Sequence, residues 1–253
     1  MKRMYPEIQI DHNKKPNRFY AVPLLGFVVK VFMIIPVGIE LWALRVAQFF
    51  FSILNSVNIF FRGRYWKMAY ELNLGIMQLE TNVAFFLYGI TDTYPGFSLH
   101  TTNYSLAMDF NKTPNSVLAT PLLGVIFRVV LLIPYAIYRQ VISFAAFLSV
   151  VVGWMWVLFA GRYPETTYEI VVDSVRIDQA VNMYYLGMSD TYPSWKISMN
   201  HKTLKIVLLV LAALLTLMTF SGRFAGNHRP QPQMQKNYHM MNTVEKPTNQ
   251  YTY

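Results

Sequence analysis

The stretch Asp92-Thr93-Tyr94-Pro95 recurs unchanged as Asp190-Thr191-Tyr192-Pro193, 98 residues further along the chain. A gapless alignment at that offset gives 28 identities in the 85 pairs that run from Asp11 to Pro95. Self-similarity over this length indicates an internal duplication, so the two halves are expected to share one fold.

Three further motifs repeat at the same offset, and each combines a turn residue with apolar or basic neighbours. They are Pro-Leu-Leu-Gly at 23–26 and 121–124, Ile-Pro at 35–36 and 133–134, and Gly-Arg-Tyr at 63–65 and 161–163. Since these motifs mark the ends and bends of elements, the order of elements is expected to be the same in both halves.

The composition is typical of an integral membrane protein. Of the 253 residues 54% are hydrophobic and only 14% are charged, about half the usual charged fraction of a soluble domain. The formal charge of +9 fits the basic residues that membrane proteins keep on their cytoplasmic side, so nucleic-acid binding is not expected. The chain has no cysteine, which excludes disulfides and a cysteine nucleophile.

Each half begins with a long apolar stretch that is predicted to fold as a helical hairpin. The predicted spans are 20–37 and 42–61 in the first half, and 118–136 and 140–160 in the second. A single helix over the first stretch would be about 60 Å long, roughly twice the hydrocarbon thickness, so a break is expected at Pro36 and at Pro134. Alternatively, the first helix of each pair lies along the membrane surface, because Lys30 and Arg128 fall halfway along it.

An amphipathic helix follows each hairpin, at Met68 to Tyr88 and at Thr166 to Leu186, and is predicted to lie at the membrane interface. Short alternating stretches then predict a small cytoplasmic sheet that joins the two halves. These stretches are Ile8 to Ile10, Phe97 to His100, Tyr104 to Phe110 and Trp195 to Met199.

The predicted fold is therefore an all-α integral membrane protein with a minor β component, built as a tandem pseudo-twofold repeat. The first repeat covers 1–101 and the second 102–200. One further C-terminal transmembrane helix is predicted over 201–221, and a disordered polar tail over 222–253.

Together, these motifs resemble a bacterial and archaeal membrane family catalogued as domain of unknown function 4389. The similarity covers two tandem copies over roughly 5–199, with Gly161-Arg162-Tyr163-Pro164 keeping the family pattern. The first copy departs from it, because Trp66 replaces the proline. The resemblance implies a multi-pass protein of the bacterial inner membrane and supplies no activity.

Two pairs of charged residues that recur in both halves suggest a hypothesis about how the repeats are joined. If the amphipathic helices pack antiparallel, Arg64 approaches Asp190 and Arg162 approaches Asp92, which gives two equivalent inter-repeat clamps. In the simpler interpretation, each aspartate caps its own Thr-Tyr-Pro turn through the local backbone.

Polar residues within the apolar stretches are candidates for binding. Lys30 and Arg128 either extend toward the headgroups or form a basic pocket for an anionic lipid or a partner carboxylate. Asn55 and Asn58 are expected to hydrogen-bond between helices, with an ion path as the alternative. The histidines lack ligand spacing, so neither a metal nor a cofactor is expected.

The leading functional prediction is a non-enzymatic membrane scaffold or accessory subunit of a membrane complex. The alternative is lipid or small-solute binding or transport, through a site between the repeats lined by Lys30, Arg128, Asn55 and Asn58. The expected partners are the lipid bilayer, including anionic lipids, and a membrane protein or a second copy of this chain. Five positive charges before the first apolar stretch favour a cytoplasmic N-terminus, and the predicted crossings then place the C-terminal tail outside.

Overall fold

The computed structural model describes residues 6–9, 16–22, 25–99, 105–107, 113–115, 117–120, 123–197 and 202–226. The chain divides into two compact units, Met1–Thr216 and Leu217–Tyr253. In chain order the elements are β1 (Glu7–Gln9), the short 3-10 helix η1 (Arg18–Ala21), α1 (Leu25–Arg62), α2 (Lys67–Leu87), β2 (Ser105–Ala107), α3 (Leu123–Ala160), α4 (Glu165–Tyr185) and α5 (Lys202–Gly226).

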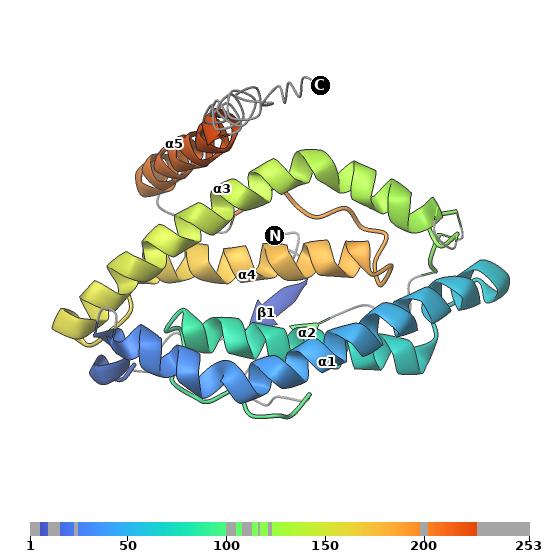
Figure 1. Cartoon of the computed structure of the whole chain (residues 1–253), viewed down its shortest axis with the longest axis horizontal. Helices are drawn as coiled ribbons and strands as arrows, with labels where there is room; N and C mark the ends of the chain where they lie inside the picture. The colour runs from blue at the N-terminus through green and yellow to red at the C-terminus, as the bar shows by residue number, and fades with distance from the viewer. Residues whose placement is uncertain are drawn as a thin grey trace, which may run out of the picture. The chain divides into compact units, whose positions relative to one another are not determined.

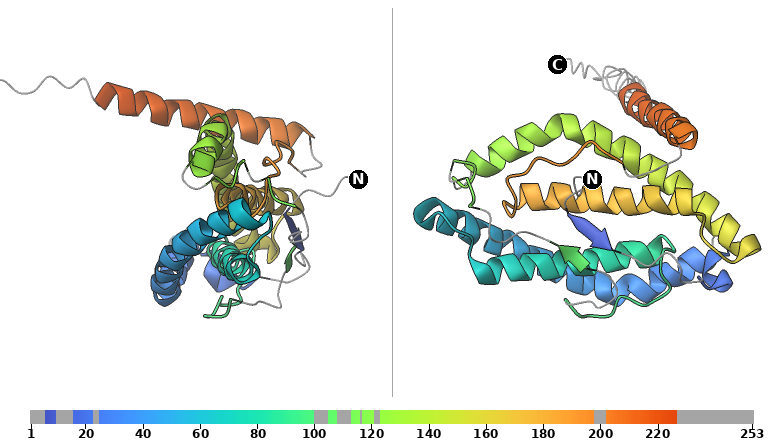
Figure 2. Two further views of the ribbon diagram at one scale, coloured as in Figure 1. Left: turned by 90° about the vertical axis from the view of Figure 1, so that its right-hand side faces the viewer. Right: turned by 180° about the vertical axis from the view of Figure 1, so that it is seen from behind.

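The first unit is mostly helical and its two halves contain matching helices. In each half a helix of 38 residues is followed by one of 21 residues. Figures 1 and 2 show α2 running back along α1 and α4 running back along α3. α2 and α4 also contact each other, so they lie between the two long helices.

The predicted helical hairpins are wrong, because each apolar stretch forms one continuous helix. Pro36 lies inside α1 and Pro134 inside α3, and Figure 1 draws α3 as one bent but uninterrupted helix. An interior proline removes one hydrogen bond and bends a helix. On either side of Pro36 the buried residues Ile34 and Val37 keep α1 packed, so tertiary contacts hold the helix together where the sequence predicts a break.

A glycine ends each long helix and turns the chain back. Gly63 and Gly161 have positive φ angles of 66° and 69°, which glycine adopts without steric cost. Their backbone N–H groups donate to Ile59 and Val157 at 2.8 Å and close the last turn of the helix. The repeated Gly-Arg-Tyr motif is therefore a helix C-cap followed by a reversal.

The amphipathic helices exist where they were predicted, but they form the core rather than a surface layer. Ile76 and Leu79 of α2 are fully buried and pack with Val37 and Leu41 of α1. In α4 the buried residue Val171 packs with apolar residues of α3. The long helices therefore cover α2 and α4 on their outer sides.

β1 pairs antiparallel with β2, with Ile8 opposite Leu106. β1 contacts α4 and β2 contacts α2, so the strands lie against the central helices. Phe97 to Leu99 and Trp195 to Ile197 are irregular instead of extended strands. Ile10, His100 and the predicted tail beyond Gly226 lie outside the described residues, as does most of the predicted strand around β2.

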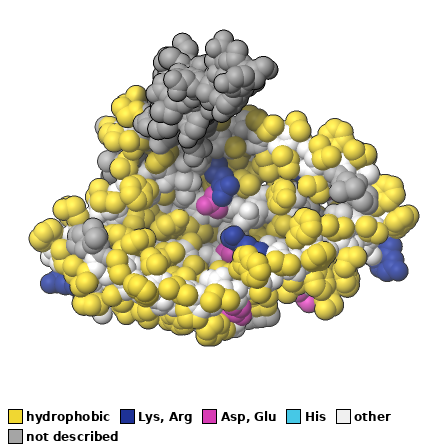
Figure 3. Space-filling view, in the orientation of Figure 1, with side chains coloured by type: hydrophobic (Ala, Val, Ile, Leu, Met, Phe, Trp, Pro, Cys, Tyr) yellow, Lys and Arg dark blue, Asp and Glu magenta, His cyan; other side chains and the backbone are white. Residues whose placement is uncertain are grey.

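Among the helices of the described residues, α1 and α3 are long and apolar enough to cross a membrane. In α5 the described apolar segment is shorter, Leu209–Thr219. Large apolar side chains are exposed along both long helices, among them Trp42 and Phe61 of α1 and Phe159 of α3. Figure 3 shows that such side chains cover most of the face in view.

Candidate functional site: two repeat-related charge centres

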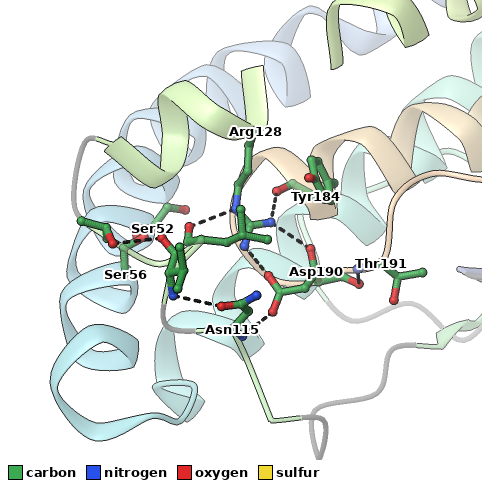
Figure 4. Close-up of polar contacts among 11 residues, drawn as sticks. Ser52, Ser56, Asn115, Arg128, Tyr184, Asp190 and Thr191 are labelled. Carbon is green, nitrogen blue, oxygen red and sulfur yellow. Dashed lines mark hydrogen bonds and ion pairs between the residues drawn. The ribbon is translucent and has the colours of Figure 1, made fainter. Parts of the chain in front are cut away.

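Arg128 is the central residue of the first of two charged sites, although it belongs to the apolar helix α3. Its side chain is buried, with 2% of the residue exposed. We call the group formed by Arg128, Asp190, Asn115 and Tyr184 the Arg128 centre. Figure 4 shows the guanidinium pointing from α3 toward the end of α4 and the turn that follows it.

The guanidinium of Arg128 donates hydrogen bonds to four acceptors. Nη1 donates to the carbonyls of Tyr184 at 2.7 Å and Ser189 at 3.0 Å, and Nε donates to the carbonyl of Leu118 at 3.3 Å. Nη2 forms an ion pair with the carboxylate of Asp190. The carbonyl of Tyr184 is at the C-terminus of α4, where a positive charge is favourable.

Asp190 connects Arg128 to a third segment of the chain. Its other carboxylate oxygen accepts the backbone N–H of Asn115 at 2.6 Å. The side chain of Asn115 in turn accepts the backbone N–H of Val117 at 3.0 Å. One carboxylate therefore ties together the segment before α3, α3 itself and the turn after α4.

The Lys30 centre repeats this arrangement in the first half, with Lys30, Asp92, Asn17 and Phe86. Nζ of Lys30 donates to the carbonyl of Phe86 at 2.9 Å and lies 3.3 Å from Asp92. Asp92 accepts the backbone N–H of Asn17, whose side chain accepts the N–H of Phe19 at 3.0 Å. All four residues precede those of the Arg128 centre by the repeat offset.

An aromatic ring lies beside each buried cation. Nζ of Lys30 is 4.9 Å from the centroid of the Phe86 ring, and the guanidinium carbon of Arg128 is 5.0 Å from that of Tyr184. Burial raises the pKa of the Tyr184 phenol, with Arg128 opposing the shift. Tyr184 is therefore neutral at physiological pH and contributes the negative face of its ring to the cation.

The inter-repeat clamp predicted from the sequence is wrong. Among the described residues no ion pair joins Arg64 to Asp190 or Arg162 to Asp92, because each aspartate is paired within its own repeat. Among the described residues, neither aspartate is seen to accept a hydrogen bond from the backbone of its own Thr-Tyr-Pro turn. The backbone N–H groups of Thr93 and Thr191 donate to the hydroxyls of Thr91 and Ser189 instead.

Asn55 and Asn58 lie near the end of α1 and take part in neither centre's ion pair. Asn55 accepts the backbone N–H of Trp66 at 2.8 Å, and Asn58 donates to the carbonyl of Arg64 at 2.8 Å. They fix the turn between α1 and α2. Lys30, Arg128, Asn55 and Asn58 therefore do not converge on the single site that was proposed from the sequence.

Sequence reasoning missed Asn17 and Asn115, which hold the second oxygen of each aspartate. A signal for them exists, because Pro16-Asn17 and Pro114-Asn115 also repeat at the common offset. Within the described residues, no group of three or more His, Asp or Glu is placed to hold a metal ion. The chemistry that the two centres do supply is electrostatic cross-linking of helices.

Comparison with known proteins matches the second half of the chain to a protein family. The family model for domain of unknown function 4389 (DUF4389) matches residues 123–196, which span α3, α4 and the turn that contains Asp190. No curated protein and no solved structure matches this chain.

Proposed function

We propose that this chain is a non-enzymatic membrane protein that acts as a scaffold or accessory subunit of a membrane complex. The observation that carries the proposal is the exposed apolar face of α1 and α3. Trp42 is 70% exposed, and Phe61 and Phe159 are each 77% exposed. Exposed apolar surface on this scale is typical of a region that contacts lipid or a membrane partner.

The length of the uncharged stretches supports a bilayer location. Residues 140–160 of α3 contain no charged side chain and extend about 31 Å as a helix, which matches the hydrocarbon thickness. The two charged side chains of α3 fall outside this stretch and are paired, Arg128 with Asp190 and Arg139 with Asp178.

A scaffold role is supported by how the buried charges are used. The side chains of Lys30, Asp92, Arg128 and Asp190 each contact partners on other segments of their own repeat. Such groups hold helices in register, and their charges are compensated by one another. The long helices are thereby kept rigid, and their outer faces are available to partners.

We further infer that both halves are copies of the family domain and that the protein belongs to the bacterial inner membrane. The identical set of contacts at the Lys30 and Arg128 centres supports the first inference. The proposed orientation places the N-terminus in the cytoplasm and the tail outside. Anionic lipids and a membrane protein, or a second copy of this chain, are the proposed partners.

Fractionation and native extraction test this proposal. The tagged full chain should remain in the membrane pellet after an alkaline carbonate wash, and release into the supernatant would refute a membrane location. Extraction into native-lipid nanodiscs, followed by mass spectrometry, should recover a stoichiometric protein partner. Recovery of the chain alone, as a monomer, would refute the scaffold role.

The orientation of the chain in the membrane can be tested by cysteine labelling. No native residue adds background labelling, because the chain has no cysteine. Lys2→Cys and Tyr253→Cys variants are treated with a membrane-impermeant maleimide in intact spheroplasts. The proposal expects labelling at position 253, and labelling at position 2 only after permeabilisation. The reverse pattern would show the opposite orientation.

A further inference from the structure

Two cavities occupy equivalent positions in the repeats, but only one of them has room for a ligand. We call this one the open cavity. The first is lined by Lys30, Gly89 and Trp154 and has a volume of about 10 Å³. The second is lined by Arg128, Gly187 and Ser56 and has a volume of about 210 Å³. Each residue of the second set is the repeat equivalent of one in the first, with Ser56 in the place of Trp154. Both cavities lie where the long helix of one repeat meets the charge centre of the other.

Trp154 is the reason why the first cavity is closed. Its indole N–H donates to the carbonyl of Tyr88 at 3.1 Å, and its ring lies 5.7 Å from that of Phe27. A Cβ atom on Gly89 would come within 2.7 Å of the indole nitrogen, so the ring packs directly against this glycine. A large aromatic side chain from α3 therefore fills the gap beside Lys30.

Ser56 cannot fill the equivalent space beside Arg128. Its hydroxyl donates back to the carbonyl of Ser52 in its own helix at 3.0 Å, as Figure 4 shows. A Cβ atom on Gly187 would still be 4.0 Å from the Ser56 hydroxyl. The loss of the aromatic side chain leaves a space that the chain itself does not occupy.

Most of the lining of the open cavity is apolar, and part of it belongs to the exposed faces of the long helices. Phe49 and Ile53 come from α1 and Ile126 from α3, and these three side chains are 56%, 39% and 57% exposed. If these faces lie in the bilayer, as proposed above, the molecules next to the cavity are lipid chains.

The polar groups at the cavity give no reason to expect a charged ligand. Arg128 lines it, but its guanidinium already donates to three carbonyls and is paired with Asp190. A paired, hydrogen-bonded cation attracts an additional anion weakly. The twin cavity is filled by the largely apolar side chain of Trp154, whose one polar group is used on the carbonyl of Tyr88.

We propose that the open cavity between α1 and α3 binds the acyl chain of a membrane lipid. The inference rests on the proposed membrane location. The chain takes the place that Trp154 fills in the other repeat, and it seals the contact between the two repeats beside the Arg128 centre. The duplicated protein thus has one site closed by its own side chain and one closed by lipid.

Photolabelling tests the proposal. The full chain is reconstituted in phosphatidylcholine vesicles that contain a fraction of the same lipid with a diazirine on the acyl chain, and labelled residues are mapped by mass spectrometry after irradiation. Wild type should be labelled at the buried cavity residues Ser52 and Gly187, and also on the outward face at Trp42 and Phe159. Ser56→Trp should lose the cavity labels and keep the outward labels, whereas the matched control Ser56→Ala should keep both.

A variant in the other repeat keeps the proposal testable if Ser56→Trp does not fold. Trp154→Ser should open the first cavity and add labels at its buried lining residues Gly89 and Val157. Outward labels without cavity labels in wild type, or cavity labels that persist in Ser56→Trp, would overturn the acyl-chain site alone. Absence of outward labels would overturn the membrane location, and the acyl-chain site with it.

Discussion

Asp190 and Arg128 are 62 residues apart in the chain and form an ion pair, and Asp92 and Lys30 form the same pair at the same separation. Each pair joins the start of a 38-residue helix to the turn after the helix that packs along it. The repeated Asp-Thr-Tyr-Pro motif is therefore one half of a cross-link whose other half lies in the apolar stretch.

Neutralising either aspartate should destabilise the protein strongly. Asp190→Asn and Asp92→Asn each leave a buried cation without its counter-charge, which costs about 3 kcal/mol, the lower end for a buried pair because the aspartates are 23% and 22% exposed. The measurement is thermal unfolding of the reconstituted protein. The control is Glu71→Gln, which breaks an exposed pair with Lys67 and should cost less than about 1 kcal/mol. Equal effects of all three variants would contradict the cross-link.

Lysine and arginine should not be interchangeable between the two centres. Arg128→Lys loses the planar donors that reach the carbonyls of Leu118 and Ser189, which should cost about 1–3 kcal/mol. Lys30→Arg overfills a centre that has only about 10 Å³ of free space. Adding Trp154→Ser to Lys30→Arg should recover part of the stability, since it opens that space. A double variant that is simply the sum of its parts would contradict the coupling.

Replacing either of two glycines in the long helices by alanine should change the stability of the protein, but in opposite directions. A Cβ atom on Gly153 would lie 2.2 Å from the ring of Tyr163, so Gly153→Ala should lower the free energy of unfolding by about 1–3 kcal/mol. Gly38 has no neighbour within 4 Å of a Cβ atom, and its repeat equivalent is Ala136. Gly38→Ala should therefore raise stability by about 0.5–1 kcal/mol. Similar melting temperatures for the two variants would contradict this packing.

Stability should fall at strongly alkaline pH, partly through Tyr163. Burial raises the pKa of the Tyr163 phenol above its ordinary value of about 10. Because the folded state holds this proton more tightly than the unfolded state, the stability it contributes is full below pH 10 and is lost as the pH rises beyond that. Denaturation monitored between pH 8 and about pH 11 should be less steep for Tyr163→Phe than for wild type. An unchanged slope would contradict the burial of this phenol.

Several features could be predicted from the sequence because they depend on local patterns. The duplication, the positions of the shorter helices and the turn at Gly161 follow from identity at a fixed offset, from helical periodicity and from the needs of a tight turn. The sequence also singled out Lys30 and Arg128, because a basic residue within an apolar stretch requires a partner.

The partners themselves could not be predicted. Asp92 was assigned to Arg162 of the other repeat or to its own turn, since nothing local indicates that Lys30 reaches it across 62 residues. The break at Pro36 was predicted from the cost of an interior proline. That cost is modest beside the packing of Ile34, Val37 and Leu41, which the sequence of α1 alone does not reveal.

By itself, the sequence determined that this protein is two related halves of apolar and amphipathic helices with a basic residue at the same place in each. Only the tertiary structure decided that each apolar stretch is one helix, that each aspartate pairs within its own repeat, and that Trp154 closes one cavity while Ser56 leaves its twin open. The physical reason is that helix formation depends on neighbours along the chain, whereas pairing and cavity filling depend on which helix faces meet across space.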